Sequence, residues 1–344
     1  MSNLFLSLLA ERPWLLADGA TGTSLFARGL QSGDAPELWN LERPEDIRAH
    51  YRSFIEAGSD IVLTNTFGGT ANRLKLHKAE GKLREINVAA ARLLKQEAQA
   101  AGRQVVVAGS MGPTGELFEP LGPLTHADGV AAFKAQAEAL AEGGADVLWI
   151  ETISAEAEVR AAVEGASGTG LPIVVTLSFD TNGRTMMGIT PKQWAALATS
   201  LPTPLSGFGG NCGVGASELV AAMIGLSEHS PANAVLVAKS NCGVPAWVDG
   251  EIVYSGTPKL MADYARLARD AGARIIGGCC GTTPTHVAAM KASLDGYTPG
   301  PRPTLDEVTA RLGAVSDGTV RLGLLGPETS EDAGRGRRRR RASF

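Results

Sequence analysis

The chain has 344 residues, of which 44% are hydrophobic and 20% are charged. This composition supplies a sizeable apolar core and excludes a mainly disordered chain, and no apolar run approaches the roughly 18 residues that a membrane span needs. Four cysteines are too few for a secreted disulfide scaffold, and the first twenty residues lack the features of an export signal. We therefore expect a cytoplasmic protein with no membrane partner.

Charge is distributed unevenly along the chain. The net charge is -4, yet Arg335 and the run 337–341 place six arginines near the C-terminal end, so the preceding residues are strongly acidic. The arginines follow a polar, glycine-containing stretch and have no aromatic residues between them. We interpret them as a solvated tail rather than a folded nucleic-acid module; the alternative is a docking tail for an acidic partner or for nucleic acid, although no interleaved aromatic residues support nucleic acid specifically.

Short β-branched segments alternate with amphipathic helical segments along most of the chain. Strands are predicted at residues 14–17, 60–64, 104–108, 146–150, 172–177, 205–209, 234–238 and 274–276. Between them, apolar residues recur with a helical period, for example at 128–142, 155–164, 190–200, 217–226, 258–270 and 284–294. Eight βα units in about 295 residues predict an α/β protein with the closed (β/α)8 architecture of a TIM barrel.

The end of the barrel pattern divides the chain into two parts. We expect residues 1–295 to form the barrel, and residues 296–344 to be a C-terminal extension. This extension is expected to be disordered, with one more helix at 304–312 and the arginine-rich end.

Polar and glycine-rich segments follow each predicted strand. In a (β/α)8 barrel these loops converge on the C-terminal rim, where such enzymes carry their chemistry. The candidate residues in these segments are Asp18, Gly19, Thr66, Ser110, Glu151, Asn211, Cys212, Cys279 and Cys280.

Cys212 comes at the end of the sixth predicted strand, and Cys279 and Cys280 come at the end of the eighth, so all three can point into the barrel mouth. Cys279 and Cys280 are adjacent, and adjacent cysteines form a disulfide only with strained geometry. Together with Cys212 they provide three zinc ligands and leave one position open, which is typical of a catalytic zinc site. Two alternatives stay open at this point: buried cysteines that act as small hydrophobic residues, and a redox pair.

An open position on a thiolate-bound zinc suits a substrate that is itself a thiol, because the cation favours the thiolate. An amino-acid thiol also needs an anion for its ammonium group, which Asp18 or Glu151 can provide, and donors for its carboxylate, which the backbone around Gly19, Gly109 and Ser110 can provide. The alternatives are that Asp18 caps a helix and that Glu151 is tied to the backbone.

The motifs DGATGT, TNTFGGT, GSMGPTGE, IETI, GNC and GGCCGTTPTHV occur in this order between about residues 12 and 295. In this order and spacing they resemble the homocysteine S-methyltransferase family, and most of all the homocysteine-binding module of cobalamin-dependent methionine synthase. Betaine-homocysteine methyltransferase is related to it. The resemblance implies a TIM barrel in which Cys212, Cys279 and Cys280 hold a catalytic Zn2+ at the C-terminal rim.

The resemblance also implies the reaction and the substrate site. A homocysteine thiolate on zinc attacks a donor methyl group and yields methionine, so no catalytic residue is expected beyond the zinc-activated substrate thiol. Asp18, Gly19 and Glu151 are expected to hold the amino and backbone groups of homocysteine. Thr66, Ser110 and Asn211 are expected to line the same pocket.

The methyl donor is the open question, since the family uses betaine, S-methylmethionine or a methylcorrinoid protein. Ala35, Gly68 and Thr152 stand where betaine enzymes place aromatic residues, although Trp39 lies near the first of these. The sequences of the loops favour a stand-alone module of a split methionine synthase. Its donor would be a methylcorrinoid protein that docks on the barrel mouth. Betaine and S-methylmethionine are the alternatives.

A different class of function is a non-catalytic subunit that binds a thiol at the same zinc. Cys242, after the seventh predicted strand, is interpreted as a small pocket residue; the alternative is a fourth zinc ligand in the absence of substrate.

Overall fold

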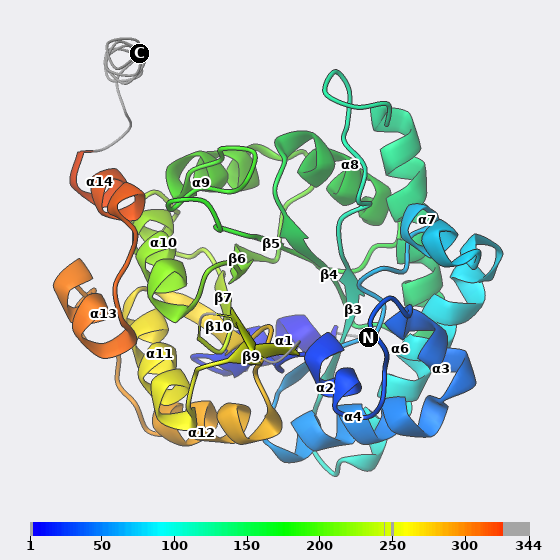
Figure 1. The fold of residues 1–344 in the computed structure, drawn as a ribbon, viewed down its shortest axis with the longest axis horizontal. Helices are drawn as coiled ribbons and strands as arrows, with labels where there is room; N and C mark the ends of the chain where they lie inside the picture. Colours follow the sequence, from blue (N-terminus) through cyan, green and yellow to red (C-terminus); the bar gives the residue numbers. More distant parts are fainter. Residues whose placement is uncertain (1–2, 244, 249–250, 326–344) are drawn as a thin grey trace.

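The computed structural model describes residues 3–243, 245–248 and 251–325 of the chain. Eight parallel strands form one sheet in the order β1, β10, β7, β6, β5, β4, β3 and β2. A bridge between Ala17 and Ile61 connects the two outer strands, and the Asp18 N–H donates to the Ile61 carbonyl at 3.0 Å. The sheet is therefore the barrel that the sequence predicts (Figure 1).

Every predicted strand is present, and several run further than predicted. The strands are β1 (Leu15–Leu16), β2 (Ile61–Leu63), β3 (Val106–Met111), β4 (Val147–Ile153), β5 (Ile173–Leu177), β6 (Gly207–Cys212), β7 (Leu236–Ser240) and β10 (Ala273–Gly278). The prediction stopped where the apolar run ended, but backbone pairing continues into the polar residues that follow. A hairpin of β8 (Pro245–Val248) and β9 (Glu251–Tyr254) follows β7 and was not predicted.

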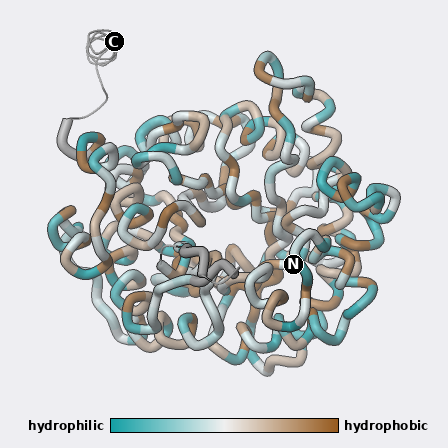
Figure 2. The backbone as a smooth tube through the Cα atoms, in the orientation of Figure 1, coloured by the Kyte–Doolittle hydropathy of each residue, from teal (hydrophilic) through white to brown (hydrophobic). Residues whose placement is uncertain are grey.

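The helices surround the strands as a ring (Figure 1). They are α2 (Gly22–Phe26), α3 (Trp39–Glu42), α4 (Pro44–Glu56), α5 (Ala71–Leu74), α6 (Leu83–Ala100), α7 (His126–Gly143), α8 (Glu156–Ser167), α9 (Pro191–Ser200), α10 (Ala216–Glu228), α11 (Pro258–Asp270) and α12 (Pro284–Leu294). Three short 3-10 helices, Pro36–Leu38, Lys75–His77 and Glu80–Lys82, lie in the loops. The ring helices mix hydrophilic and hydrophobic stretches, as helices with one buried face do (Figure 2).

The inside of the barrel is filled with apolar side chains. Alternate residues of each strand point inward, and their lower positions form one buried cluster: Leu15, Ala17, Ile61, Leu63, Val106, Ala108, Val147, Trp149, Val174, Val237 and Ile275. Phe5, Leu8 and Leu9 of α1 (Leu4–Glu11) belong to the same cluster. This first helix, which was not predicted, therefore fills the N-terminal end of the barrel.

The segment after residue 295 is not disordered up to Leu325, contrary to our expectation. It contains α13 (Leu305–Leu312), close to the predicted helix at 304–312, and α14 (Asp317–Leu325). The Glu218 carboxylate of α10 accepts hydrogen bonds from the Ser316 N–H and the Thr319 hydroxyl, so the extension is fastened to the ring. The arginine-rich run lies outside the described residues. Among the described helices, none is long and apolar enough to cross a bilayer.

His50 of α4 is a buried histidine without a polar partner. It packs against the rings of Tyr51 and Phe54, and neither ring nitrogen has a hydrogen-bond partner among the described residues. Burial, with a smaller contribution from the Arg28 charge, lowers the pKa of His50 to about 3. The unfolded chain therefore binds a proton below pH 6.5 that the folded protein rejects, which makes the fold less stable as the pH falls.

His50→Leu is expected to reduce this acid sensitivity. Between pH 6 and pH 4 the free energy of unfolding of the wild type should fall by about 1.4 kcal/mol per pH unit more than that of the variant. Urea unfolding at the two pH values measures the difference. His77→Gln is the control, because His77 is exposed. Equal acid sensitivity of wild type and His50→Leu would contradict the prediction.

Candidate functional site

The inward-facing residues at the C-terminal ends of the strands are polar. Each follows an inward apolar residue or glycine by two positions, so the apolar interior is covered at the barrel mouth by one polar layer. Its members are Ser110, Glu151, Thr176, Asn211, Lys239 and Cys279.

Three cysteine sulfurs converge in this mouth. The sulfurs of Cys212, at the end of β6, and of Cys279 and Cys280, directly after β10, all lie within 4.8 Å of one another. The distance between the Cys212 and Cys280 sulfurs is 4.0 Å. The Cys280 N–H donates to Asn241 Oδ1 at 3.0 Å. This hydrogen bond holds the backbone at Cys279 and Cys280 in place.

This group of thiols fits a zinc ion by its chemistry and spacing. Tetrahedral zinc with bonds of about 2.3 Å to sulfur requires sulfurs roughly 3.8 Å apart. The Cys212 thiol and burial raise the pKa of Cys279. A hydrogen bond with Cys279 lowers the pKa of Cys212, but the Cys280 thiol and burial outweigh it and raise that pKa to about 11. Three thiolates at this spacing therefore need a cation, and Cys212, Cys279 and Cys280 can hold one.

Cys242 does not belong to this group of three sulfurs. Its side chain is buried and lies so close to Gly256 that a Cβ atom there would be 2.6 Å from the Cys242 sulfur. Its backbone N–H donates to the Cys280 carbonyl at 2.9 Å. The structure places Cys242 as a small packing residue beneath the cysteine loop.

A buried ion pair lies beside the thiols. Lys239 Nζ donates to Asp18 Oδ1 at 2.6 Å, and the Leu63 N–H donates to Asp18 Oδ2 at 2.7 Å. Both charged side chains are 2% exposed or less. Burial lowers the pKa of Lys239, but the carboxylates of Asp18 and Glu151 outweigh this effect and hold it above its usual value. Asp18 therefore has a cationic partner already, and it does not cap α2, whose N-cap is Thr21.

Sequence reasoning missed Lys239. The available signal was a single charged residue in the otherwise apolar segment LVAKS, at a position whose parity points inward. A lysine there has to find a buried carboxylate, because an unpaired charge is too costly in the interior of a barrel.

Glu151 and Ser110 form the neighbouring part of the mouth. Ser110 Oγ donates to Glu151 Oε1 at 2.6 Å, and burial raises the pKa of Glu151 while the Lys239 charge opposes the rise. The backbone N–H of Ser110, which we expected to be free for a substrate carboxylate, donates to Thr64 Oγ1 at 3.0 Å. Thr66 is fully buried, and its hydroxyl donates to the Ser110 carbonyl at 2.7 Å, so it supports this strand end from below.

Gly19 allows a close approach of two loops. A Cβ atom at this position would lie 2.4 Å from the Thr282 carbonyl oxygen and 2.8 Å from a ring carbon of Phe54. The Ala20 N–H donates to the same carbonyl at 3.0 Å. Glycine is thus required for the first loop to pack against the loop that carries Cys279 and Cys280.

Asn211 is fully buried, and its amide is occupied by protein groups. Its Oδ1 accepts from the Thr152 N–H at 2.8 Å and from the Thr176 hydroxyl at 2.7 Å. Its Nδ2 donates to Thr152 Oγ1 at 2.7 Å and contacts the Cys279 sulfur at 3.8 Å. Sequence reasoning did not identify the contacts of Thr152 and Thr176 with the Asn211 amide.

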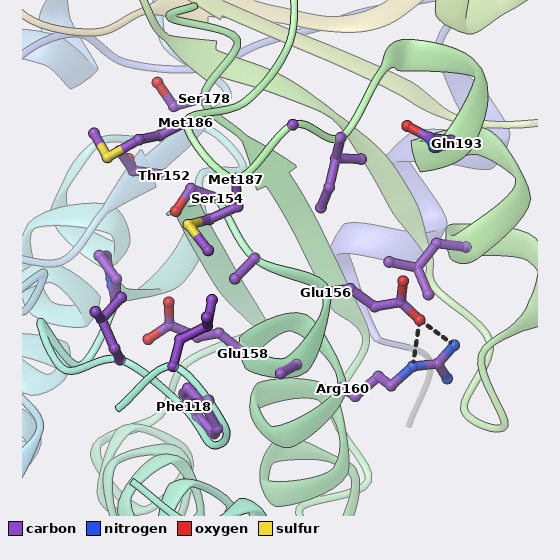
Figure 3. Close-up of a pocket in the computed structure, with 18 of the residues that line it drawn as sticks. Phe118, Thr152, Ser154, Glu156, Glu158, Arg160, Ser178, Met186, Met187 and Gln193 are labelled. Carbon is purple, nitrogen blue, oxygen red and sulfur yellow. Dashed lines mark hydrogen bonds and ion pairs between the residues drawn. The ribbon is translucent and has the colours of Figure 1, made fainter. Parts of the chain in front are cut away.

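A groove of about 1060 Å³ opens beside Thr152, between the loops that follow β3, β4 and β5. Met186 and Met187 line it and are 71% and 40% exposed. Figure 3 shows them near Thr152 and Ser154, with the ion pair of Glu156 and Arg160 at the other side.

The positions considered for an aromatic cage contain no aromatic residue: they are Ala35, Gly68 and Thr152. Trp39 is 6% exposed, and the Arg43 guanidinium lies 3.9 Å from the centre of its ring. One face of this indole is therefore already covered by a cation of the protein itself.

Lys239→Met is expected to lower the free energy of unfolding by about 3 kcal/mol, because it leaves the Asp18 carboxylate buried without its partner. The double variant Asp18→Asn with Lys239→Met removes the Asp18 charge together with its partner and should recover part of this loss. Urea unfolding of the three proteins measures the effect. A double variant no more stable than Lys239→Met would contradict it.

Comparisons with known proteins identify the family of the chain. A model of the family described as homocysteine S-methyltransferase matches residues 15–294. Methionine synthase from Mycobacterium tuberculosis is 30% identical over 305 residues, which are 84% of this chain and 25% of that protein. The corresponding values for methionine synthase from Mycobacterium leprae are 30%, 314 residues, 86% and 26%, so the chain spans about a quarter of the length of these curated relatives.

A solved structure gives the same result. The homocysteine methyltransferase MmuM from Escherichia coli, in its metallated form, superposes with a TM-score of 0.70 at 27% identity, covering 84% of this chain and 99% of that chain. The fold, the family match and the relatives therefore lead to one conclusion: the chain belongs to the homocysteine S-methyltransferase family and is a methyltransferase.

Proposed function

We propose that this chain is a zinc-dependent homocysteine S-methyltransferase that forms methionine, and that its methyl donor is a methylcorrinoid protein. The observation that carries the proposal is the convergence of three cysteine sulfurs beside a buried carboxylate, Glu151, in the mouth of the barrel. A metal-activated thiol and an ammonium anchor are the two requirements for an amino-acid thiol. We propose residues 1–295 as the homocysteine-binding module.

The substrate is held at both ends. Zinc bound by Cys212, Cys279 and Cys280 supplies a positive charge that favours the thiolate form of the substrate thiol. The ammonium group binds at Glu151, whose Oε1 is oriented by Ser110. Asp18 contributes to the same acidic environment, Gly19 keeps the first loop close to the cysteine loop, and Thr66 and Asn211 form the supporting walls of the pocket.

Methyl transfer then requires little else from the protein. A sulfur lone pair attacks the methyl carbon in line, the new S–C bond forms, and the bond between the methyl group and the donor breaks with its electron pair left on the donor. The thiol proton is released to solvent. No general base is needed among the residues of the mouth, and a reducing compartment such as the cytoplasm keeps the three cysteines available as thiols.

The shape of the rim favours a large donor over a small quaternary ammonium. The groove beside Thr152 is open and is bordered by exposed methionines, which suit a broad apolar partner surface. Betaine recognition requires an aromatic cage, and Ala35, Gly68 and Thr152 do not provide one. The likeness to methionine synthases supports the same choice of donor.

Methionine formation from homocysteine tests the reaction and the donor together. The zinc-loaded protein is assayed in parallel with methylcobalamin, betaine and S-methylmethionine, and we expect turnover with methylcobalamin alone. Cys280→Ala should lower this rate by at least about a hundredfold, because it removes one zinc ligand. Turnover with betaine would overturn the proposed donor. Homocysteine binding without turnover from any donor would indicate a non-catalytic thiol-binding subunit.

Metal content provides an independent test of the zinc ligands. We expect one zinc per chain, with affinity for zinc lowered at least about tenfold in Cys212→Ser and Cys280→Ser and unchanged in Cys242→Ser, since the Cys242 sulfur lies outside the cluster. Elemental analysis and competition with a chelator measure these values. Equal loss in Cys242→Ser and Cys280→Ser would make Cys242 a ligand.

A further inference from the structure

Two residues of the candidate site have a backbone conformation that is unfavourable for residues with a side chain. Thr152 has φ of 64° and Cys212 has φ of 59°, both in the left-handed region. For a β-branched residue such as threonine this conformation is unfavourable, so it persists only where neighbouring contacts hold it. Strain of this kind indicates that neighbouring contacts fix the backbone, and with it the side-chain positions, at the candidate site.

The strain at Thr152 belongs to a β-bulge in β4. Ile150 pairs with Val175 and Ile153 pairs with Leu177, so β4 has one residue more than β5 over this stretch. The extra residue is one of the two, Glu151 and Thr152, that lie between these paired positions. A bulge redirects the side chains next to it, and here it accompanies the inward position of the Glu151 carboxylate against Ser110.

Asn211 holds this bulge and touches the thiol cluster at the same time. Its amide makes two hydrogen bonds to Thr152, one to the backbone N–H at 2.8 Å and one to Oγ1 at 2.7 Å. The same Nδ2 contacts the Cys279 sulfur at 3.8 Å. One buried side chain therefore connects the backbone next to the carboxylate with a sulfur of the cluster.

Asn211 is also next to Cys212, whose left-handed backbone turns its sulfur toward Cys280. Its remaining acceptor capacity is taken by the Thr176 hydroxyl at 2.7 Å. The amide thus has two donors and one oxygen, all engaged by the protein, and it is fully buried. It acts on a substrate only through the residues that it holds.

We propose that Asn211 is a positioning residue that fixes the spacing between the Glu151 carboxylate and the thiol cluster, and that this spacing makes the site selective for the chain length of its amino-acid thiol. The inference rests on the proposed function, in which the two ends of homocysteine bind at these two places. Cysteine has one methylene fewer than homocysteine. A rigid spacing excludes cysteine, whereas a loose one accepts both.

The test compares three substitutions around the amide. Asn211→Asp keeps the size and the acceptor for Thr152 and Thr176, but it places a carboxylate oxygen against the Cys279 sulfur where an N–H stood. Thr152→Gly removes the Oγ1 atom that accepts from Asn211 Nδ2. It also relieves the backbone strain, because glycine adopts this φ without cost. Thr176→Val is the matched control, since it removes one hydroxyl from Asn211 Oδ1 and leaves both Nδ2 contacts in place.

Two quantities are measured on zinc-loaded protein: the Kd values of homocysteine and cysteine by titration calorimetry, and the affinity for zinc. We expect the preference for homocysteine over cysteine to fall about tenfold in Asn211→Asp and in Thr152→Gly, and to change less than twofold in Thr176→Val. The affinity for zinc should fall in Asn211→Asp and stay unchanged in Thr152→Gly, a pattern that general destabilisation does not produce.

The outcomes separate this inference from the proposed function. If the wild-type protein does not bind homocysteine, both fail. If it binds homocysteine and the preference over cysteine survives in Thr152→Gly and in Asn211→Asp, the positioning role is wrong while the proposed function stands. If Asn211→Asp does not fold, Thr152→Gly decides the question alone, because it leaves no buried charge and no strained threonine.

Discussion

The constraint on which the site depends is the alternation of side chains along closely paired parallel strands. In a closed barrel every second residue points inward, and the inward residues of neighbouring strands meet at one level. The lower levels are apolar in this chain, from Leu15 to Ile275, and the uppermost level is polar. The same two-residue step that buries Trp149 therefore places Glu151 in the mouth, and the step that buries Val237 places Lys239 there.

That regularity explains why most of the fold could be predicted from the sequence. Eight apolar segments separated by helical ones predict the barrel, and the polar residue after each segment predicts the rim and the three cysteines. Lys239 was overlooked because its role depends on Asp18, a residue 221 positions away that only the folded barrel brings near. The hydrogen bonds of Ser110 to Thr64 and of Asn211 to Thr152 were not predicted, because such contacts have no sequence signature.

Features outside the regular repeat were harder to predict. The hairpin of β8 and β9 and the packing of α14 on α10 depend on tertiary contacts, and periodicity alone contains no information about them. The bulge in β4 is of the same kind, because one extra residue in a strand leaves the apolar pattern almost unchanged while it reverses the direction of the side chains that follow. The bulge in β4 lies next to the candidate site, beside Glu151.

The filled N-terminal end of the barrel determines how molecules can reach the site. Phe5, Leu8 and Leu9 of α1 close the interior from below, so the mouth at the cysteine loops is the way in and the way out. In the function proposed here, the thiol substrate binds deep in this mouth, and the methyl donor approaches from above it. For the reaction proposed here, this stacking imposes a kinetic order: homocysteine enters before the donor arrives, and methionine leaves only after the donor has withdrawn.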